Sequence, residues 1–153
     1  MKLSDYLKED RIHVADAFKD TSSFYHAFAS LLKERNVIHN IKTVQRLFIK
    51  RESIQSTGIG GGAAAPHIFS NEFSKFAIFV SLIQKGLDFK SPDGRDVFLV
   101  FLIMSDDRDV GLHLKTLAHI SRLVSGTDLI DAARKTSTAG ELLQLILEKE
   151  KRI

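Results

Sequence analysis

The stretch from Arg51 to Phe69 reads RESIQSTGIGGGAAAPHIF and contains the residue types best suited to chemistry in this chain. Four glycines and three alanines in it lead to Pro66 and His67. Proline fixes its own φ and biases the preceding residue toward an extended backbone, so we expect a stiffened segment to hold the imidazole. Neutral imidazole, with an ordinary pKa of about 6.5, is a nucleophile near neutral pH. A phosphoryl group on its ring nitrogen would be easily transferred.

Phosphoryl transfer needs orientation and charge stabilisation of the phosphoryl oxygens. Arg51, sixteen residues before His67, could supply positive charge. The amides of consecutive glycines could also turn toward the imidazole and form a concave anion site. Two structural alternatives stay open: Arg51 could interact with the last carbonyls of a helix, and the glycines could serve only the close packing of backbones.

Two nucleotide-binding motifs do not account for the glycines. A Walker A loop requires a lysine after its last glycine, and none follows here. The dinucleotide fingerprint fits Gly58, Gly60 and Ala63 formally, but it should follow a strand and open a helix. A helical pattern precedes the glycines instead, and Pro66 follows them. This motif is therefore disfavoured.

Composition bounds the class of protein. The 153 residues, 44% hydrophobic and 27% charged, favour one globular domain over residues 1–153. The net charge of +3 is spread over 22 basic and 19 acidic residues, which argues against nucleic-acid binding. The absence of cysteine excludes disulfides and thiolate zinc sites. The longest apolar run, residues 97–104, is too short to span a bilayer, so the simplest interpretation is a soluble cytoplasmic protein without membrane insertion.

Hydrophobic periodicity predicts the elements that must position these residues. Helical spacing predicts amphipathic helices over residues 21–34, with an N-cap within 20–23, and from residue 41 to about 51–53. Two apolar runs, 76–83 and 97–104, predict strands covered on both faces, with a turn at 91–94 between them.

Helical signals return after the second run. An apolar stripe over 110–124 comprises Val110, His113, Leu114, Leu117, Ile120, Ser121 and Val124. Thr127 is expected to cap a short helix through residue 133, and the capping box Thr138 to Glu141, with both side chains bonding backbone amides, opens the last helix. The predicted fold class is α/β, a small mixed β-sheet flanked by helices in a single domain.

Three segments together resemble a known family. RES…STGIGGGAAAPH is similar to the active-site segment of the enzyme IIA domains of the phosphoenolpyruvate-dependent sugar phosphotransferase system, of the fructose, mannitol and nitrogen-regulatory type. GLDFKSPDGRDVFLVFLIMS resembles the segment that leads into the family's core strand, and HLKTLAHISRLV resembles its His-Leu-Lys helix. These matches cover most of the chain in the family's order, and the mixed α/β fold of the family agrees with the elements predicted above.

The resemblance implies roles for three residues. His67 matches the histidine that accepts a phosphoryl group, through Nε2, from the phosphocarrier protein HPr or its relative. Arg51 matches the arginine near that site, and His113 matches its second histidine. The implied protein is a phosphotransferase component that relays the group or uses it as a signal, with no metal or soluble cofactor. A free-standing regulatory form is expected, with enzyme IIB or a regulated kinase or transporter as further partners.

Without the resemblance, His113 would be assigned to packing. His119 lies about 240 degrees farther around the helix and should not share the site. His13, His26 and His39 have no motif support and are expected at the surface.

The chain departs from the family pattern at several positions near His67. Gly61 replaces the usual asparagine, Ala63 and Ala65 replace larger aliphatic residues, and Ile68 replaces a small residue. Ile68 and Phe69 could form an exposed docking surface or begin a buried strand. The alternative function is that of a regulatory binding protein with the same fold that acts by contact between proteins.

Overall fold

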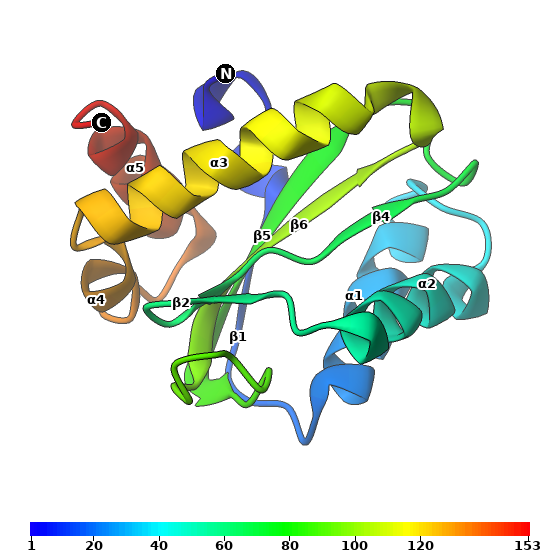
Figure 1. Cartoon of the computed structure of the whole chain (residues 1–153), viewed down its shortest axis with the longest axis horizontal. Helices are drawn as coiled ribbons and strands as arrows, with labels where there is room; N and C mark the ends of the chain where they lie inside the picture. Colours follow the sequence, from blue (N-terminus) through cyan, green and yellow to red (C-terminus); the bar gives the residue numbers. More distant parts are fainter.

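A computed structural model of residues 1–153 shows the two apolar runs as the central antiparallel pair of the sheet (Figure 1). Strand β5 spans Ala77–Leu87 and strand β6 spans Val97–Ser105, with Phe79 opposite Leu102. Between them, Gly94 has φ 71° and its amide donates to the carbonyl of Ser91, which confirms the predicted turn. Residues 77–83 of β5 and all of β6 except Phe98 are buried, as their unbroken apolar sequence predicts, whereas Gln84 and Lys85 of β5 are exposed.

Four shorter strands complete a six-stranded mixed sheet. Its order is β1-β5-β6-β3-β2, and β4 pairs with β6 beyond β3. Strand β1 runs parallel to β5, and β3 and β4 run parallel to β6, whereas β2 runs antiparallel to β3. The bounds are β1 Ile12–Ala15, β2 Gly58–Gly60, β3 Ala63–Ala64 and β4 His67–Phe69. Both ends of the glycine-rich segment, Gly58–Gly60 and Ala63–Ala64, are therefore part of the sheet.

Helices cover both faces of the sheet (Figure 1). One face carries α1 and α2, and the other carries α3, α4 and α5. Their bounds are α1 Thr21–Glu34, α2 Ile41–Ile54, α3 Val110–Gly126, α4 Leu129–Ala133 and α5 Ala139–Glu150, with 3₁₀ turns η1 Leu3–Asp5, η2 Glu9–Arg11 and η3 Asp107–Asp109. None of the helices has both the length and the apolar composition that crossing a membrane requires.

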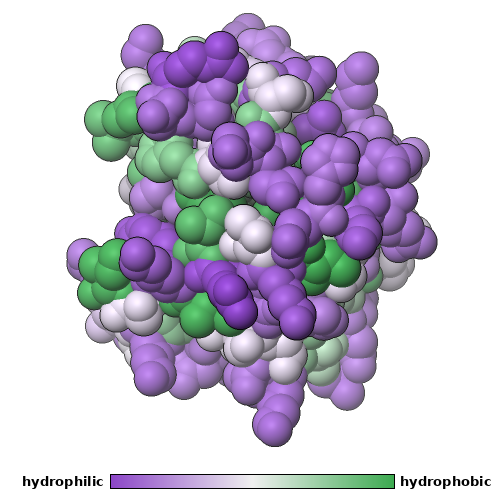
Figure 2. All heavy atoms as spheres, turned by 90° about the vertical axis from the view of Figure 1, so that its right-hand side faces the viewer, coloured by the Kyte–Doolittle hydropathy of each residue, from purple (hydrophilic) through white to green (hydrophobic).

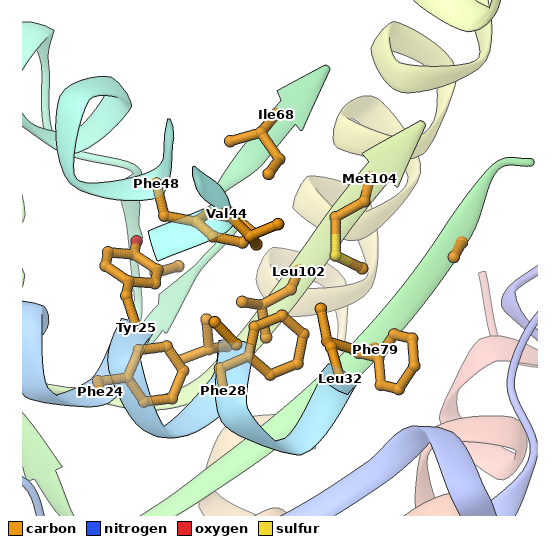
Figure 3. Close-up of a cluster of buried hydrophobic side chains, with 14 of the residues drawn as sticks. Phe24, Tyr25, Phe28, Leu32, Val44, Phe48, Ile68, Phe79, Leu102 and Met104 are labelled. Atoms are coloured by element: carbon orange, nitrogen blue, oxygen red, sulfur yellow. The ribbon is translucent and has the colours of Figure 1, made fainter. Parts of the chain in front are cut away.

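Each face has its own hydrophobic core, because alternate side chains of β5 and β6 point to opposite sides. The core under α1 and α2 is rich in aromatic rings, and Figure 3 shows them meeting side chains of the sheet. Tyr25 stacks on Phe48 at 4.9 Å between ring centroids, and Phe28 meets Phe79 edge-on at 5.6 Å. Ile68 of β4 also belongs to this core. The burial of Ile68 thus holds strand β4, which carries His67, against the core under α1 and α2.

The helix caps follow their sequence signals with two differences. Asp20 caps α1 through the amide of Ser23, and Thr138 caps α5 through the amide of Glu141. The Glu141 carboxylate accepts from the hydroxyls of Ser137 and Thr138, so the prediction that it bonds a backbone amide was wrong. The hydroxyl of Thr127 accepts from the amide of Leu129 at the start of α4, but the N-cap residue of this helix is Asp128, one position after the residue predicted.

The predicted apolar stripe of α3 was wrong at three positions. Val110 and Leu114 are 47% and 64% exposed, and Ser121 is exposed as well. The buried side of the helix consists of His113, Thr116, His119, Ile120 and Leu123. Polar residues occupy buried positions here because they find hydrogen-bond partners, whereas two apolar residues near the start of α3 face outward.

Candidate functional site

The topology brings two of the predicted site residues to one edge of the sheet. Because β4 runs parallel to the last residues of β6, His67 lies beside Ile103, two residues before Ser105 at the end of β6. The chain then turns through η3 into α3, whose first turn carries His113 back over this edge. The rings of His67 and His113 lie 6.3 Å apart between centroids, at 71° to each other.

His67 is half-buried, and its ring hydrogen-bonds to the backbone two residues before it. Its Nδ1 lies 3.0 Å from the carbonyl oxygen of Ala65. A carbonyl oxygen can only accept, so Nδ1 carries the hydrogen of the neutral ring and Nε2 has a free lone pair. Nε2 has no hydrogen-bond partner in the protein. The local geometry therefore presents Nε2 as the nucleophilic atom.

A chain of hydrogen bonds fixes the backbone that holds His67. The amide of Ala65 donates to the carbonyl of Thr57 at 2.9 Å. The amide of Thr57 donates to the Glu52 carboxylate at 3.0 Å, and its hydroxyl donates there too. Buried Tyr25 completes the chain, since its hydroxyl donates to Glu52 at 2.6 Å. Burial first, and then the Glu52 charge, raise the pKa of Tyr25 well above its usual range, so this hydroxyl keeps its proton.

His113 is enclosed, with only 2% of its surface exposed. Phe69 stacks on its ring at 4.2 Å between centroids, and Phe76 meets it edge-on at 5.5 Å. Its Nε2 lies 2.7 Å from the hydroxyl oxygen of Ser105. Burial lowers the pKa of His113 to about 4, with a further lowering from His67 and an opposing effect of Asp109. His113 is therefore neutral at pH 7.

Arg51 lies at the end of α2, and its guanidinium donates to the carbonyl of Gln55 at 2.7 Å. It makes no hydrogen bond with either imidazole. The contact with a helix-terminal carbonyl is the structural alternative that the sequence left open. The structure thus brings His67 and His113 together and shows Arg51 bonded to the backbone at the end of its helix.

The glycine turn does not face His67. The amide of Gly61 donates to the Asp93 carboxylate at 2.9 Å. A Cβ added to Gly61 or Gly62 would contact Val124 or Ile130, near the carboxyl end of α3 and in α4. At 1.5 Å per residue, Val124 lies roughly 16 Å along the helix from His113. The prediction that these amides form an anion site beside the imidazole was therefore wrong.

The turn nevertheless explains one departure from the family pattern. Gly61 has φ 66°, a left-handed conformation. Glycine adopts it freely, and asparagine tolerates it better than most residues. The glycine at this position is therefore compatible with the same backbone.

The surface beside His67 is apolar in part. Phe69 is 37% exposed, and Val110 and Leu114 lie exposed within one helical turn of His113. Ile68 is buried, so the expectation that it contributes to an exposed docking surface was wrong and the buried-strand alternative holds for it. Figure 2, which faces the side of α2, shows hydrophobic residues in separate groups among hydrophilic ones.

The other histidines lie outside this site. His119 is buried and bonds Glu150 at 2.7 Å, so it does not share the site, as predicted. His26 and His39 are exposed, whereas His13 is half-buried on β1, which corrects its expected place at the surface.

The structure contains no group of three or more His, Asp or Glu side chains that could hold a metal ion.

Sequence reasoning missed the residues that support the two imidazoles. Glu52 stands next to Arg51 in the motif, yet nothing in the sequence shows that it reaches Thr57. Ser105 is visible only as the last residue of an apolar strand, and Phe69 as an apolar residue near the nucleophile. Their roles depend on the pairing of β4 with β6, which is a tertiary contact.

Comparison with known proteins gives concordant results. Residues 5–149 match the family described as "Phosphoenolpyruvate-dependent sugar phosphotransferase system, EIIA 2". A nitrogen regulatory protein of Bradyrhizobium diazoefficiens is 30% identical over 107 residues, which cover 70% of each chain. A fructose-specific EIIABC component of Bacillus subtilis is 24% identical over 151 residues, or 99% of this chain, which spans about a quarter of that relative's length.

The fold also matches solved structures. The crystal structure of the nitrogen regulatory protein IIA-Ntr from Neisseria meningitidis superimposes with a TM-score of 0.83 at 23% identity. The match covers 94% of this chain and 98% of that one. This likeness confirms the mixed α/β fold.

Proposed function

Since the chain belongs to the phosphoenolpyruvate-dependent sugar phosphotransferase system EIIA 2 family, we propose that residues 1–153 form a phosphocarrier whose His67 accepts a phosphoryl group on Nε2. The observation that carries this proposal is the hydrogen bond from Nδ1 of His67 to the carbonyl of Ala65. This bond leaves Nε2 unprotonated and without a partner, in a side chain that is half-buried.

The donor in this proposal is a phosphohistidine of an HPr-like carrier protein. The Nε2 lone pair of His67 attacks the phosphorus, the bond from phosphorus to the donor nitrogen breaks, and the donor ring keeps that electron pair. The hydrogen stays on Nδ1 of His67 and keeps its hydrogen bond to the carbonyl oxygen of Ala65, which stabilises the positive charge that develops on the ring. No metal or soluble cofactor takes part in these steps.

The neighbouring residues orient and exclude water rather than react. His113 lies 6.3 Å from His67 between ring centroids and is held by Phe69, so it is placed to hydrogen-bond a phosphoryl oxygen. Arg51 is the candidate cation for the same oxygens, and it would have to leave the Gln55 carbonyl to reach them. Its guanidinium is suited to a phosphoryl group because its donors form a rigid fork.

The next acceptor is proposed to be another protein. Exposed Phe69, Val110 and Leu114 offer apolar area that a carrier or acceptor could bury around the imidazole. The relatives named nitrogen regulatory protein and fructose-specific EIIABC component suggest two uses of the phosphoryl group, a regulatory signal and transfer to an enzyme IIB. We place this exchange in the cytoplasm.

Phosphorylation can be tested by intact mass. The chain is incubated with phosphoenolpyruvate, enzyme I and HPr, and one acid-labile phosphoryl adduct is expected. His67→Ala should lose the adduct, and His26→Ala, which changes an exposed histidine on α1, should keep it. An adduct that persists in His67→Ala would refute the site. No adduct from any carrier would refute the phosphocarrier and favour a regulatory protein that acts by contact alone.

A further inference from the structure

Ser105, the last residue of β6, makes two hydrogen bonds that together determine which nitrogen of His113 carries the proton. Its Oγ lies 2.7 Å from the carbonyl oxygen of Asp106 and 2.7 Å from Nε2 of His113. A hydroxyl has one hydrogen, and the carbonyl can only accept it. Oγ must therefore accept at its other contact, so His113 donates from Nε2–H. The neutral ring is then unprotonated at Nδ1.

Nδ1 of His113 is buried and has no hydrogen-bond partner. Most buried polar atoms are paired, and an unpaired one in a native protein calls for an explanation. Phe69 and Phe76 cover the ring, and neither offers a hydrogen-bonding group. The unprotonated Nδ1 is thus a vacant proton acceptor on a fixed ring beside His67.

We propose that Ser105 is a positioning residue, which holds His113 in the Nε2–H tautomer so that Nδ1 takes up a proton when His67 carries a phosphoryl group. The proposal rests on the proposed function of His67. The proton comes from solvent and adds to the Nδ1 lone pair, while Nε2–H stays bonded to Ser105. His113 becomes an imidazolium and offsets the new negative charge, and no other bond changes.

The charges around His113 allow this response. His67 on β4 and Asp109 at the start of α3 are the titratable groups that act on it. Asp106 and Arg108 lie nearby in sequence and form an ion pair with each other. In the unphosphorylated protein, burial and His67 outweigh Asp109 and lower the pKa of His113 to about 4, so the ring is neutral. A phosphoryl group on His67 would add one to two negative charges and shift this balance toward the imidazolium.

A purely structural role for Ser105 predicts a different outcome. If the serine only closes the end of β6, its removal should lower stability without changing the tautomer of His113. Ser81 provides a matched control, because it is also a buried serine of the central strands but its hydroxyl has no partner.

The test is the imidazole ¹⁵N spectrum of the unphosphorylated full chain as wild type, Ser105→Ala, Ser105→Thr and Ser81→Ala. We expect the Nε2–H tautomer of His113 in wild type, Ser105→Thr and Ser81→Ala, and a tautomer mixture in Ser105→Ala. An Nδ1–H tautomer in wild type, or an unchanged tautomer in Ser105→Ala, would overturn the proposal. The wild-type spectrum decides even if Ser105→Ala fails to fold.

Transfer from phosphorylated HPr supplies the second readout. Ser105→Ala should accept the phosphoryl group about tenfold more slowly, with recovery in Ser105→Thr and no change in Ser81→Ala. A Ser105→Ala rate equal to wild type would refute the link to transfer. If wild type accepts no phosphoryl group at all, the proposed function fails while the tautomer result still stands or falls by its own spectrum.

Discussion

Glu52, in the last turn of α2, accepts hydrogen bonds from both the amide and the hydroxyl of Thr57 just before β2. Thr57 in turn accepts from the amide of Ala65, whose carbonyl bonds the His67 ring. A carboxylate at a helix end thus fixes the backbone beside the nucleophile through two intervening residues. The support of this backbone therefore explains why a glutamate, Glu52, follows Arg51 in the motif.

Replacement of Glu52 by glutamine should weaken this support. The amide side chain keeps the shape but loses the charge that strengthens the bonds from Tyr25 and Thr57, so unfolding in urea should show a loss of about 1.5–3 kcal/mol. The pKa of Tyr25 should also fall while remaining raised by burial, which a spectrophotometric titration would detect. Exposed Glu34→Gln serves as the control and should change neither quantity. A Glu52→Gln protein as stable as wild type would show that the network contributes little.

Two glycines with positive φ, one in the glycine turn and one in the turn between β5 and β6, should differ in how well they tolerate alanine. Gly62 has φ 88°, and an added Cβ would lie 2.9 Å from a methyl group of Ile130. Gly62→Ala therefore combines backbone strain with a steric clash and should cost about 2–4 kcal/mol. Gly94 has φ 71° but nothing within 4 Å, so Gly94→Ala should cost only the strain, about 1–2 kcal/mol. Equal losses of stability for the two variants would argue against the packing at Ile130.

The two ends of the chain are joined by Glu150. Its carboxylate accepts from the amides of Leu3 and Ser4 and lies 2.7 Å from Nε2 of His119. Glu150→Ala should cost about 3 kcal/mol, because it leaves buried groups without partners. It should leave the amount of phosphoryl adduct unchanged at a temperature where the variant is folded, since none of these residues touches His67 or His113. Glu148→Ala, which breaks an exposed ion pair with Arg152, should cost under about 0.5 kcal/mol.

Hydrophobic periodicity predicted the main elements because it reflects burial directly. The helix over 21–34 and the strands at 77–87 and 97–105 follow from apolar spacing and run length, and the structure has them within a few residues of the predicted bounds. Nothing in the sequence indicated β1, β2 and β3, each of four residues or fewer, and β4 was indicated only as one of two alternatives for Ile68 and Phe69. Strands β3 and β4 form because β6 offers them backbone partners, and β2 forms against β3, so this information is tertiary.

The candidate site, too, was predicted only in part from the sequence, because some of its contacts are tertiary. The motif placed His67, and its resemblance to a family placed His113, but the contacts that define their protonation come from elsewhere. Ser105 bonds His113 from the neighbouring strand, and Ala65 bonds His67 only because β3 and β4 are extended. The glycines failed as a guide to the site, because their backbone is needed for a turn at the other end of α3.

The low pKa of His113 makes a prediction about stability as a function of pH. In the folded chain this pKa is lowered from 6.5 to about 4, mainly by burial. Between these two pH values the unfolded chain binds a proton that the folded chain does not, so the free energy of unfolding should fall as pH falls from about 6.5 to 4. The full contribution, present above the unfolded pKa, is about 3 kcal/mol.

Comparison with His113→Gln isolates this contribution, because other titrating groups such as His13 are common to both proteins. The difference in unfolding free energy between wild type and His113→Gln should be largest at pH 7.5 and should change by about 3 kcal/mol toward pH 4, measured by urea unfolding at each pH. A difference that stays constant over this range would mean that His113 titrates normally in the folded chain. In the phosphorylated chain the negative charge on His67 should raise the pKa of His113 back toward its ordinary value, which the imidazole ¹⁵N spectrum would show near neutral pH, where the adduct survives.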